Sequence, residues 1–355
     1  MQALLCGYYG EHNLGDDALL EALLAQMPAG WSALVTAWDE AAVQERHGVA
    51  TVQRRGVGGV LRVLNGCDAL VFGGGSLLQD STSFRSLLYY AALVLKARWQ
   101  GKPVLLWGQG LGPLRRRRSR ALVALVLPRV TAMSWRDPES ARLARELGGS
   151  GAAGSDPVWS LPPATPVPAA GGAPLRPIVL CWRPVAQLQG HAWIPYLEAL
   201  AALSEETARP VLWLPFHQHQ DRGLVQRLES EGLLPPPLLQ RSRELEVATP
   251  EEAQRVFAGA ALVIAMRLHG LILAALAGAP CAALSYDPKV AAAAAALGCP
   301  CQELGQAVEA QQLRLAWGAA LNHPLPAGRI QAQREGTKVH RLLLQQHLKA
   351  PGASP

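Results

Sequence analysis

Hydrophobic and polar positions along the chain follow a repeating unit: a short apolar run, a glycine-rich or polar turn, and an amphipathic stretch. Such a unit predicts a strand, a turn and a helix in succession. In the first half of the chain, the apolar runs that predict strands stand at 3–7, 68–72, 102–108 and 130–135. Asp137 and Pro138 mark one helix start, because Asp caps a helix and Pro suits its first position.

The same unit returns in the second half. Strands are expected at 177–182, 209–216, 261–266 and 280–286, with helices at 192–206, 249–260, 270–278 and from Pro288 onward. Thr249 and Asp287 stand where helix caps are needed. Between the halves, residues 161–177 read LPPATPVPAAGGAPLRP, which has neither strand nor helix periodicity and indicates a linker.

This pattern predicts an α/β fold with two Rossmann-like, doubly wound parallel-sheet domains and a deep cleft between them. We expect a first domain over 1–160, the linker at 161–177, a second domain over 178–325 and a helix within 326–355. In such folds ligands bind at the carboxyl ends of the strands. Polar residues directly after strands are therefore the candidates for function.

Composition narrows the class of protein. Half of the 355 residues are hydrophobic and 17% are charged, which is typical of an ordered globular protein. The net charge of +6 suits an anionic ligand or surface, and without a recognition motif it predicts no nucleic-acid partner. The six cysteines form no CxxC pair, so no zinc site or disulfide framework is expected. We find no signal-peptide pattern, and the long uncharged apolar run 268–286 is short for a membrane span, so we expect a cytoplasmic protein.

The first candidate site is the turn GYYGEHNLGDDALL at 7–20, where glycines such as Gly15 allow a tight turn after the first strand. Asp16 and Asp17 fall at the start of a helix, where they would repel a bound phosphate. They favour binding a hydroxyl group or acting as a general base, while capping by one of them is the alternative. Asn13 adds a further polar group beside them.

Two glycine-rich turns follow later strands. Gly74 and Gly75 lie in FGGGSLLQD, and Gln109 lies in WGQGLGPL. The glycines allow a ligand to approach the backbone closely, or they serve a tight turn that needs positive φ. We expect both turns to line the same cleft.

Cations follow three further strands. Arg136 can bind a carboxylate or phosphate with its planar fork, and a salt bridge to a neighbouring acid is the alternative. Arg267 and His269 alternate at a strand end, so both can face one way; a satisfied core histidine is the alternative. Lys289 lies in the first turn of a helix, where a cation is unfavourable unless an anion compensates.

Two more stretches carry charge or metal-ligating groups. His217, His219 and Asp221 alternate in PFHQHQD, but with no further ligand in view a substrate contact or loop role is favoured over a metal site. The basic run Arg115–Arg118 suits a solvated helix start, with attraction to anionic lipid headgroups or to a diphosphate as the alternative.

Taken in order, GYYGEHNLGDDALLEALL, FGGGSLLQD, GQGLGPL, SWRDPES, PFHQHQD, MRLHG and SYDPKV resemble the polysaccharide pyruvyl transferase family, CsaB type, from Gly7 to about Gly298. The resemblance implies a GT-B-like fold in which the last helix returns to the first domain. It also implies transfer of pyruvate from phosphoenolpyruvate onto two hydroxyls of a sugar, giving a ketal. The sugar is often N-acetylmannosamine of a cell-wall polymer or of its lipid-linked precursor.

The resemblance also suggests roles for the candidate residues. Arg136, Arg267 and Lys289 would bind phosphoenolpyruvate together with His269, which would also be the catalytic acid. Asp16 or Asp17 would orient or deprotonate the acceptor hydroxyl. The acceptor side of the cleft would be lined by Asn13, Gly15, Gly74, Gly75, Gln109 and His217. Phosphoenolpyruvate is a co-substrate, so no cofactor and no metal are expected. The expected partners are phosphoenolpyruvate and a glycan or lipid-diphosphate-linked sugar, with peripheral contact to the inner membrane face.

Two other functions compete with this one. A GT-B nucleotide-sugar glycosyltransferase would need a site for base and ribose, commonly a glutamate after a strand, and the sequence offers no convincing candidate. A catalytically silent sugar- or lipid-carrier-binding protein would have no need of Arg136, Arg267, His269 and Lys289 around one cleft.

Overall fold

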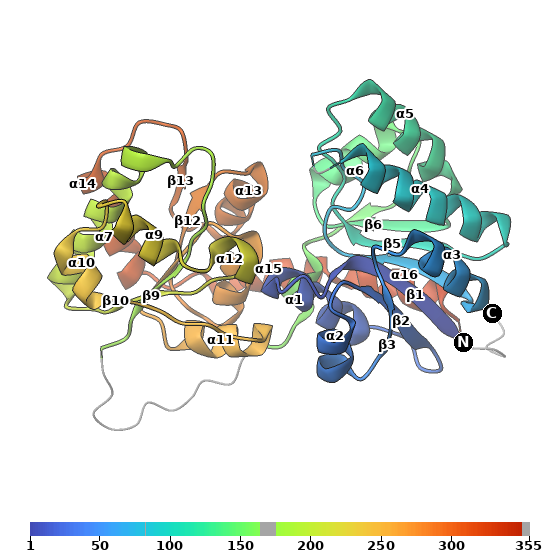
Figure 1. Ribbon diagram of the computed structural model, residues 1–355, viewed down its shortest axis with the longest axis horizontal. Coiled ribbons are helices and arrows are strands. Elements are labelled where there is room, and N and C mark those ends of the chain that lie inside the picture. Colours follow the sequence, from blue (N-terminus) through green and yellow to red (C-terminus); the bar gives the residue numbers. More distant parts are fainter. Residues whose placement is uncertain (82, 164–174, 350–355) are drawn as a thin grey trace. The chain divides into compact units, whose positions relative to one another are not determined.

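The computed structural model describes residues 1–81, 83–163 and 175–349. Most of the expected linker, 164–174, lies outside the described residues. Contacts divide the chain into two compact units. Unit 1 comprises Met1–Glu11, Asp16–Leu161 and Gln333–Pro355, and unit 2 comprises His12–Gly15 and Pro162–Ala332. Each unit is a sheet between helices (Figure 1).

Unit 1 contains a parallel sheet of seven strands in the order β3-β2-β1-β4-β5-β6-β7. The central strands are buried on both faces, which explains their continuous apolar runs, such as ALVFG in β4. The strand bounds are β1 (Gln2–Tyr9), β2 (Ser32–Ala37), β3 (Ala50–Gln53), β4 (Ala69–Gly73), β5 (Val104–Gln109), β6 (Ala132–Trp135) and β7 (Ala152–Ala153).

Helices cover both faces of this sheet. Their bounds are α1 (Leu14–Leu24), α2 (Glu40–His47), α3 (Val57–Val63), α4 (Phe84–Trp99), α5 (Arg117–Val126), α6 (Pro138–Glu146) and α16 (Lys338–His347), with 3₁₀ turns η1 (Leu64–Gly66), η2 (Leu127–Arg129) and η3 (Pro157–Ser160). The buried sides of α3, α4 and α5 pack on one face of the sheet, against strand residues such as Leu70 and Leu106.

Helix α16 packs against β5 and β6, although it comes from the far end of the chain (Figure 1). His340 of this helix is fully buried and bonds the Ser134 hydroxyl through Nδ1 (2.8 Å) and the Ser155 carbonyl through Nε2 (2.7 Å). Because a carbonyl only accepts, the ring is protonated at Nε2. Burial lowers the pKa of His340, so the imidazole is neutral here.

Unit 2 contains a parallel sheet of six strands in the order β10-β9-β8-β11-β12-β13. Its strands are β8 (Ile178–Cys181), β9 (Val211–Trp213), β10 (Ser242–Glu244), β11 (Leu262–Ala265), β12 (Cys281–Ser285) and β13 (Cys301–Glu303). Its helices are α7 (Ile194–Thr207), α8 (Gln218–Asp221), α9 (Leu224–Ser230), α10 (Pro236–Arg241), α11 (Pro250–Ala258), α12 (Leu268–Leu276), α13 (Pro288–Leu297) and α14 (Ala310–Asn322), with the 3₁₀ turn η4 (Gly190–Trp193). Helix α15 (Ala327–Gly336) begins in this unit and ends in unit 1.

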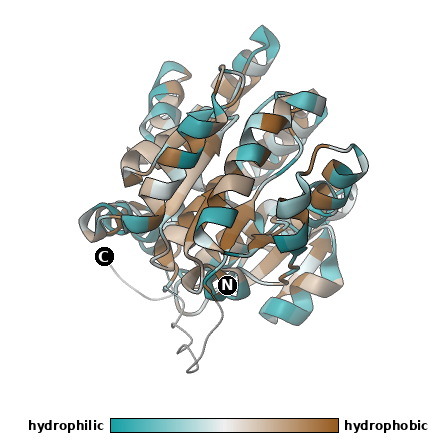
Figure 2. Ribbon diagram, turned by 90° about the vertical axis from the view of Figure 1, so that its left-hand side faces the viewer, coloured by the Kyte–Doolittle hydropathy of each residue, from teal (hydrophilic) through white to brown (hydrophobic). Residues whose placement is uncertain are grey.

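In Figure 2 the strands are largely hydrophobic, and the helices carry both hydrophobic and hydrophilic residues. In unit 2 a group of indole rings, Trp182, Trp193, Trp213 and Trp317, fills the core beside β8 and β9. Within the described residues, no helix is both long and apolar enough to span a bilayer.

The two parallel sheets with alternating helices confirm the predicted fold class. The predicted caps are confirmed as well: Asp137, Thr249 and Asp287 each accept a backbone N–H in the first turn of their helix. The structure adds elements that the pattern did not predict, above all β2 and β3 with α2 and α3. In place of the one helix expected within 326–355, the structure has two, α15 and α16.

Candidate functional site

Polar side chains follow four neighbouring strands of unit 2. Arg183 comes after β8, His217 after β9, Arg267 after β11 and Lys289 after β12. In a parallel sheet these positions share one edge, the edge at which doubly wound folds bind their ligands. The order of strands reverses between β8 and β11, and Arg183 and Arg267 therefore stand at the switch point.

Arg267 is held by Asp221, the last residue of α8. Its Nε donates to Oδ2 of Asp221 over 3.1 Å, and its Nη2 donates to Oδ1. The Asp221 side chain is fully buried, and its Oδ2 also accepts the backbone N–H groups of Phe216 (3.1 Å) and His217 (2.8 Å). One carboxylate thus fixes both the arginine and the turn that carries His217. The Arg267 side chain keeps 11% exposure.

His217 has a buried Nδ1 atom with no hydrogen-bond partner among the described residues. Burial lowers its pKa, and the positive charge of Arg267 lowers it further. The imidazole is therefore neutral at pH 7. His217 is one of ten residues with such an atom among those described, and at this sheet edge a ligand atom could complete its hydrogen bonding.

The segment His12–Gly15 belongs to unit 2, although it lies near the start of the chain. Leu14 donates its N–H to the Phe216 carbonyl, and the Gln218 N–H donates to the His12 carbonyl, each over 3.0 Å. The His12 and His219 rings lie 5.6 Å apart, centroid to centroid. The predicted acceptor residue Asn13 pairs with His217 as a backbone bridge.

His269, in the first turn of α12, lies directly against Gly15. A Cβ atom at residue 15 would be 2.3 Å from Nδ1 of His269, so any residue but glycine would displace the imidazole. Asn13 Oδ1 accepts the Gly15 N–H over 3.1 Å and holds this backbone in place. Five predicted site residues therefore come together in unit 2: Asn13, Gly15, His217, Arg267 and His269.

Lys289 is half-buried in the first turn of α13, and its N–H donates to the carboxylate of Asp287 over 2.9 Å. Sequence reasoning missed Arg183 and the role of Asp221. The Arg183 Nη1 donates to the Tyr286 hydroxyl over 3.2 Å, and its positive charge acts on His217. The sequence could have indicated Arg183, because it stands two residues after the end of a buried strand, as Arg267 does.

The other predicted residues lie in unit 1. Gly74 and Gly75 have φ of +66° and +72°, so the turn itself requires glycine. Gln109 is buried and uses both ends of its amide on that turn, donating to the Gly74 carbonyl (2.6 Å) and accepting the Leu77 N–H (3.4 Å). The glutamine holds the loop after β4 in shape.

Arg136 is also buried, at 9% exposure. Its Nη1 donates to Asp156 over 3.2 Å and its Nη2 to the Ser76 hydroxyl over 3.0 Å. The neighbouring Asp137 lies farther away, with its Oδ2 3.9 Å from Nε. The main carboxylate partner is therefore Asp156, twenty residues along the chain, which sequence reasoning did not anticipate.

The two acidic residues at the start of α1 differ in their surroundings. Asp17 is buried and accepts a hydrogen bond from Arg46 Nη1 over 2.6 Å. Asp16 is half-exposed, and its negative charge helps to raise the pKa of the buried Tyr9, after burial itself. Within the described part of the chain, no group of His, Cys, Asp and Glu has a geometry suited to a metal ion.

Solved structures with a similar fold cover almost the whole chain. They include a UDP-N-acetylglucosamine 2-epimerase from Methanocaldococcus jannaschii (TM-score 0.62, 13% identity, 96% of this chain and 98% of that one). A putative enzyme of the same name from Listeria monocytogenes (0.61, 13%, 97% and 94%) and MurG from Acinetobacter baumannii (0.52, 14%, 97% and 99%) are similar as well. At these identities the likeness defines a fold class, and the class is GT-B-like.

The family follows from the sequence. The family model for polysaccharide pyruvyl transferase matches residues 13–288, so the chain belongs to the polysaccharide pyruvyl transferase family. No curated protein matches the chain.

Proposed function

We propose that this protein transfers the pyruvyl group of phosphoenolpyruvate onto two hydroxyls of a sugar in a cell-wall or exopolysaccharide, or in its lipid-linked precursor. The family supports pyruvyl transfer, and the donor and the acceptor class are our inference. The observation that supports the donor most is the group of Arg267, His217 and His269 at one sheet edge of unit 2. Phosphoenolpyruvate carries a phosphate and a carboxylate, and both need cations and N–H donors.

The residues at this sheet edge of unit 2 are our candidates for binding the donor. We assign Arg267 and Lys289 to the anionic groups of the donor, with His269 beside them. Arg183 is a further cation at the same edge. Arg136 pairs with a buried carboxylate as Arg267 does, but it also donates to the Ser76 hydroxyl, so we assign it to holding the turns after β4 and β6 in place.

The reaction begins with a proton transfer from His269 to C3 of the enol, which becomes a methyl group. C2 becomes electrophilic and bonds the first sugar oxygen, whose proton leaves to a base. The bond from C2 to the phosphate oxygen then breaks, and the second hydroxyl oxygen bonds C2 to close the ketal. Of the two hydroxyl protons, one replaces the proton given to C3 and the other leaves with phosphate. General acids and bases typically contribute roughly 10²–10⁴-fold each.

Asp16 is our candidate for the base. It follows Gly15 directly in the chain and is half-exposed, whereas Asp17 is buried. Because phosphoenolpyruvate is a cytoplasmic metabolite, we place the protein in the cytoplasm.

The test is release of phosphate from phosphoenolpyruvate with a panel of N-acetylhexosamine lipid-diphosphate analogues. We expect acceptor-dependent release by the wild type and a loss of roughly 10²–10⁴-fold in His269→Ala. His191→Ala, at an exposed position of η4, is the matched control and should keep its activity. If no acceptor supports release, and UDP or GDP raises the melting temperature while phosphoenolpyruvate does not, the nucleotide-sugar glycosyltransferase replaces this function.

A further inference from the structure

One stretch of unit 1 has an unusual charge composition. Residues 81–136 contain eleven Lys and Arg and no Asp or Glu. This excess is larger than the net charge of +6 of the whole chain, so the remaining residues are acidic on balance. The stretch includes α4 and α5, and two of its cations are paired with carboxylates from outside it, Arg120 with Glu146 and the buried Arg136 with Asp156.

The outward face of α4 is apolar. Leu88, Leu95 and Trp99 are 46%, 38% and 86% exposed, and Ala92 between them is exposed as well. Steps of four, three and four residues place all four on one helix face. Single exposed leucines are ordinary, but a row of them that ends in an exposed tryptophan marks a binding surface.

Helix α5 packs beside α4 and extends this face. Leu125 of α5 is 47% exposed. The guanidinium of Arg118 lies 4.3 Å from the centroid of the Phe84 ring, which ties the start of α5 to the start of α4. We call the exposed sides of these two helices, with Leu88, Leu95, Trp99 and Leu125, the α4–α5 surface.

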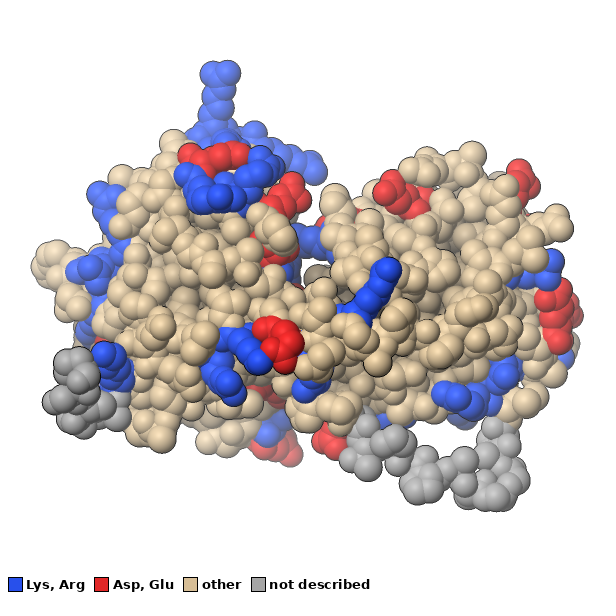
Figure 3. Space-filling model, turned by 180° about the vertical axis from the view of Figure 1, so that it is seen from behind, with Lys and Arg blue, Asp and Glu red and all other residues tan. Residues whose placement is uncertain are grey.

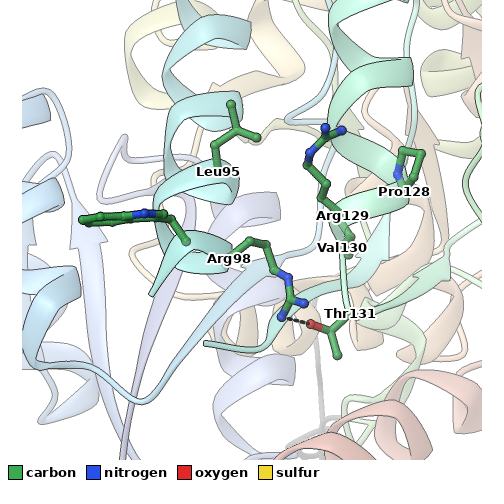
Figure 4. A pocket seen from close by; sticks show the side chains of 7 residues that line it. Leu95, Arg98, Pro128, Arg129, Val130 and Thr131 are labelled. Carbon is green, nitrogen blue, oxygen red and sulfur yellow. Dashed lines mark hydrogen bonds between the residues drawn. The ribbon is translucent and has the colours of Figure 1, made fainter. Parts of the chain in front are cut away.

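The far ends of the two helices border one hollow on the surface. In Figure 4, Leu95 and Arg98 lie on one side of this hollow, and Pro128 and Arg129 of η2 lie on the other. Arg98 Nη1 donates to the Thr131 hydroxyl over 3.4 Å. Arg98 and Arg129 therefore place positive charge beside the apolar row at this end of α4 as well.

The arginine run is fixed at the start of α5. Asp80 accepts the backbone N–H groups of Arg115 (3.0 Å) and Arg116 (2.8 Å), so the side chains point outward from an anchored backbone. Figure 3 shows Lys and Arg gathered over the end of unit 1 where Figure 1 places α5. None of the side chains Arg115–Arg118 forms a salt bridge with a described carboxylate. Asp80 supplies one negative charge at this positive helix end, so the four cations still leave an excess of positive charge that an external anion would compensate.

We propose that the α4–α5 surface docks on an anionic lipid bilayer. The apolar row enters the interface between headgroups and acyl chains, and the arginines lie against the lipid phosphates. Leucines favour acyl chains over nucleic acid, whose bases would stack on aromatic rings. Docking rests on the charge and exposure of unit 1 and does not depend on pyruvyl transfer.

Co-sedimentation of the full chain with phosphatidylglycerol vesicles and phosphatidylcholine vesicles tests this surface. We expect binding to phosphatidylglycerol that weakens at high salt, and little binding to phosphatidylcholine. The pair Arg116→Gln with Arg117→Gln should weaken binding about 25-fold, since each cation near the bilayer contributes about fivefold. The pair Arg241→Gln with Arg243→Gln removes the same charge from exposed positions of unit 2 and should leave binding within about twofold.

The apolar row has its own pair of variants. Trp99→Ser should weaken binding by about tenfold or more, whereas Leu315→Ser, at a 56% exposed position of α14, should not. Brominated acyl chains should quench part of the tryptophan fluorescence of the wild type, and Trp99→Leu should lose that part.

Three results would overturn the docking surface. They are no binding of the wild type to phosphatidylglycerol, equal losses in the two arginine pairs, or release from vesicles by single-stranded RNA with unchanged binding in Trp99→Ser. Release by RNA would indicate that Arg115–Arg118 bind nucleic acid. Phosphate release with a soluble acceptor should be unchanged in all these variants, so failure of docking is distinguishable from failure of pyruvyl transfer.

Discussion

The two sheets end in edges that look alike in sequence and differ in structure. In unit 1 the polar groups at the edge are bonded within the unit: Gln109 to the turn after β4, Arg136 to Asp156, and Asp17 to Arg46. In unit 2 the pair of Arg267 and Asp221 is internal, but the Nδ1 of His217 is buried without a described partner. Polar residues after strands are thus no guide to function until their hydrogen bonds are accounted for. Of the edge residues compared, those of unit 1 hold turns in shape, whereas His217 of unit 2 has a buried nitrogen that a ligand can bond.

The largest effect should come from removing Asp156. In Asp156→Ala, the guanidinium of Arg136 would stay buried without its carboxylate, and the Val158 N–H would lose its acceptor. We expect the free energy of unfolding in urea to fall by about 3–5 kcal/mol. Asp156→Asn keeps an acceptor and should lose less. A loss below about 1 kcal/mol in the alanine variant would contradict a structural role for this edge.

Gly15→Ala should affect activity more than stability, which overpacking should lower by about 1–3 kcal/mol. The new Cβ would displace the His269 imidazole, and a misplaced catalytic group can cost about 10²-fold in turnover. The control is Gly66→Ala, where a Cβ meets no neighbour within 4 Å. Turnover is measured by phosphate release and stability by the melting temperature. Normal turnover in Gly15→Ala would remove His269 from the chemistry.

The smallest expected effect is a pH dependence of stability that arises from His340 in unit 1. Burial lowers the pKa of His340, so the unfolded chain binds a proton before the folded chain does. Stability should therefore fall as pH drops below about 6.5 towards the folded pKa, by up to about 1.4 kcal/mol for each pKa unit of difference. Urea unfolding at pH 8 and pH 5.5 measures this. His340→Gln should be less stable than the wild type at pH 8, and its free energy of unfolding should fall less between pH 8 and pH 5.5. If the fall is the same as in the wild type, the pH dependence comes from other groups.

Much of the fold could be predicted from the alternation of apolar runs and polar turns. The central strands of both sheets are buried on both faces, so their sequences are continuous apolar runs. The edge strands escaped prediction because they are short and partly exposed: β3 is ATVQ and β10 is SRE. Caps such as Asp137 were predictable because their geometry is local to four residues.

The site was harder to predict because its contacts are distant in sequence. Arg267 and Asp221 are 46 residues apart, and only the fold brings them together. The contact between Gly15 and His269 spans most of the chain, so the need for glycine at position 15 could not be seen from its turn alone. The roles of the predicted site residues in catalysis and binding stay predictions until the variants are measured.

The route of the backbone between the units has a consequence for how the protein is made. Neither unit is a continuous segment: unit 2 takes His12–Gly15 from the start of the chain, and unit 1 takes α16 from its end. During synthesis, unit 1 has to wait for the residues of α16 before His340 can close its core. A fragment cut at the linker would leave unit 2 without the backbone that supports His269. Attempts to express the halves separately should therefore carry these short pieces with them, by fusing residues 12–15 to the second half and α16 to the first.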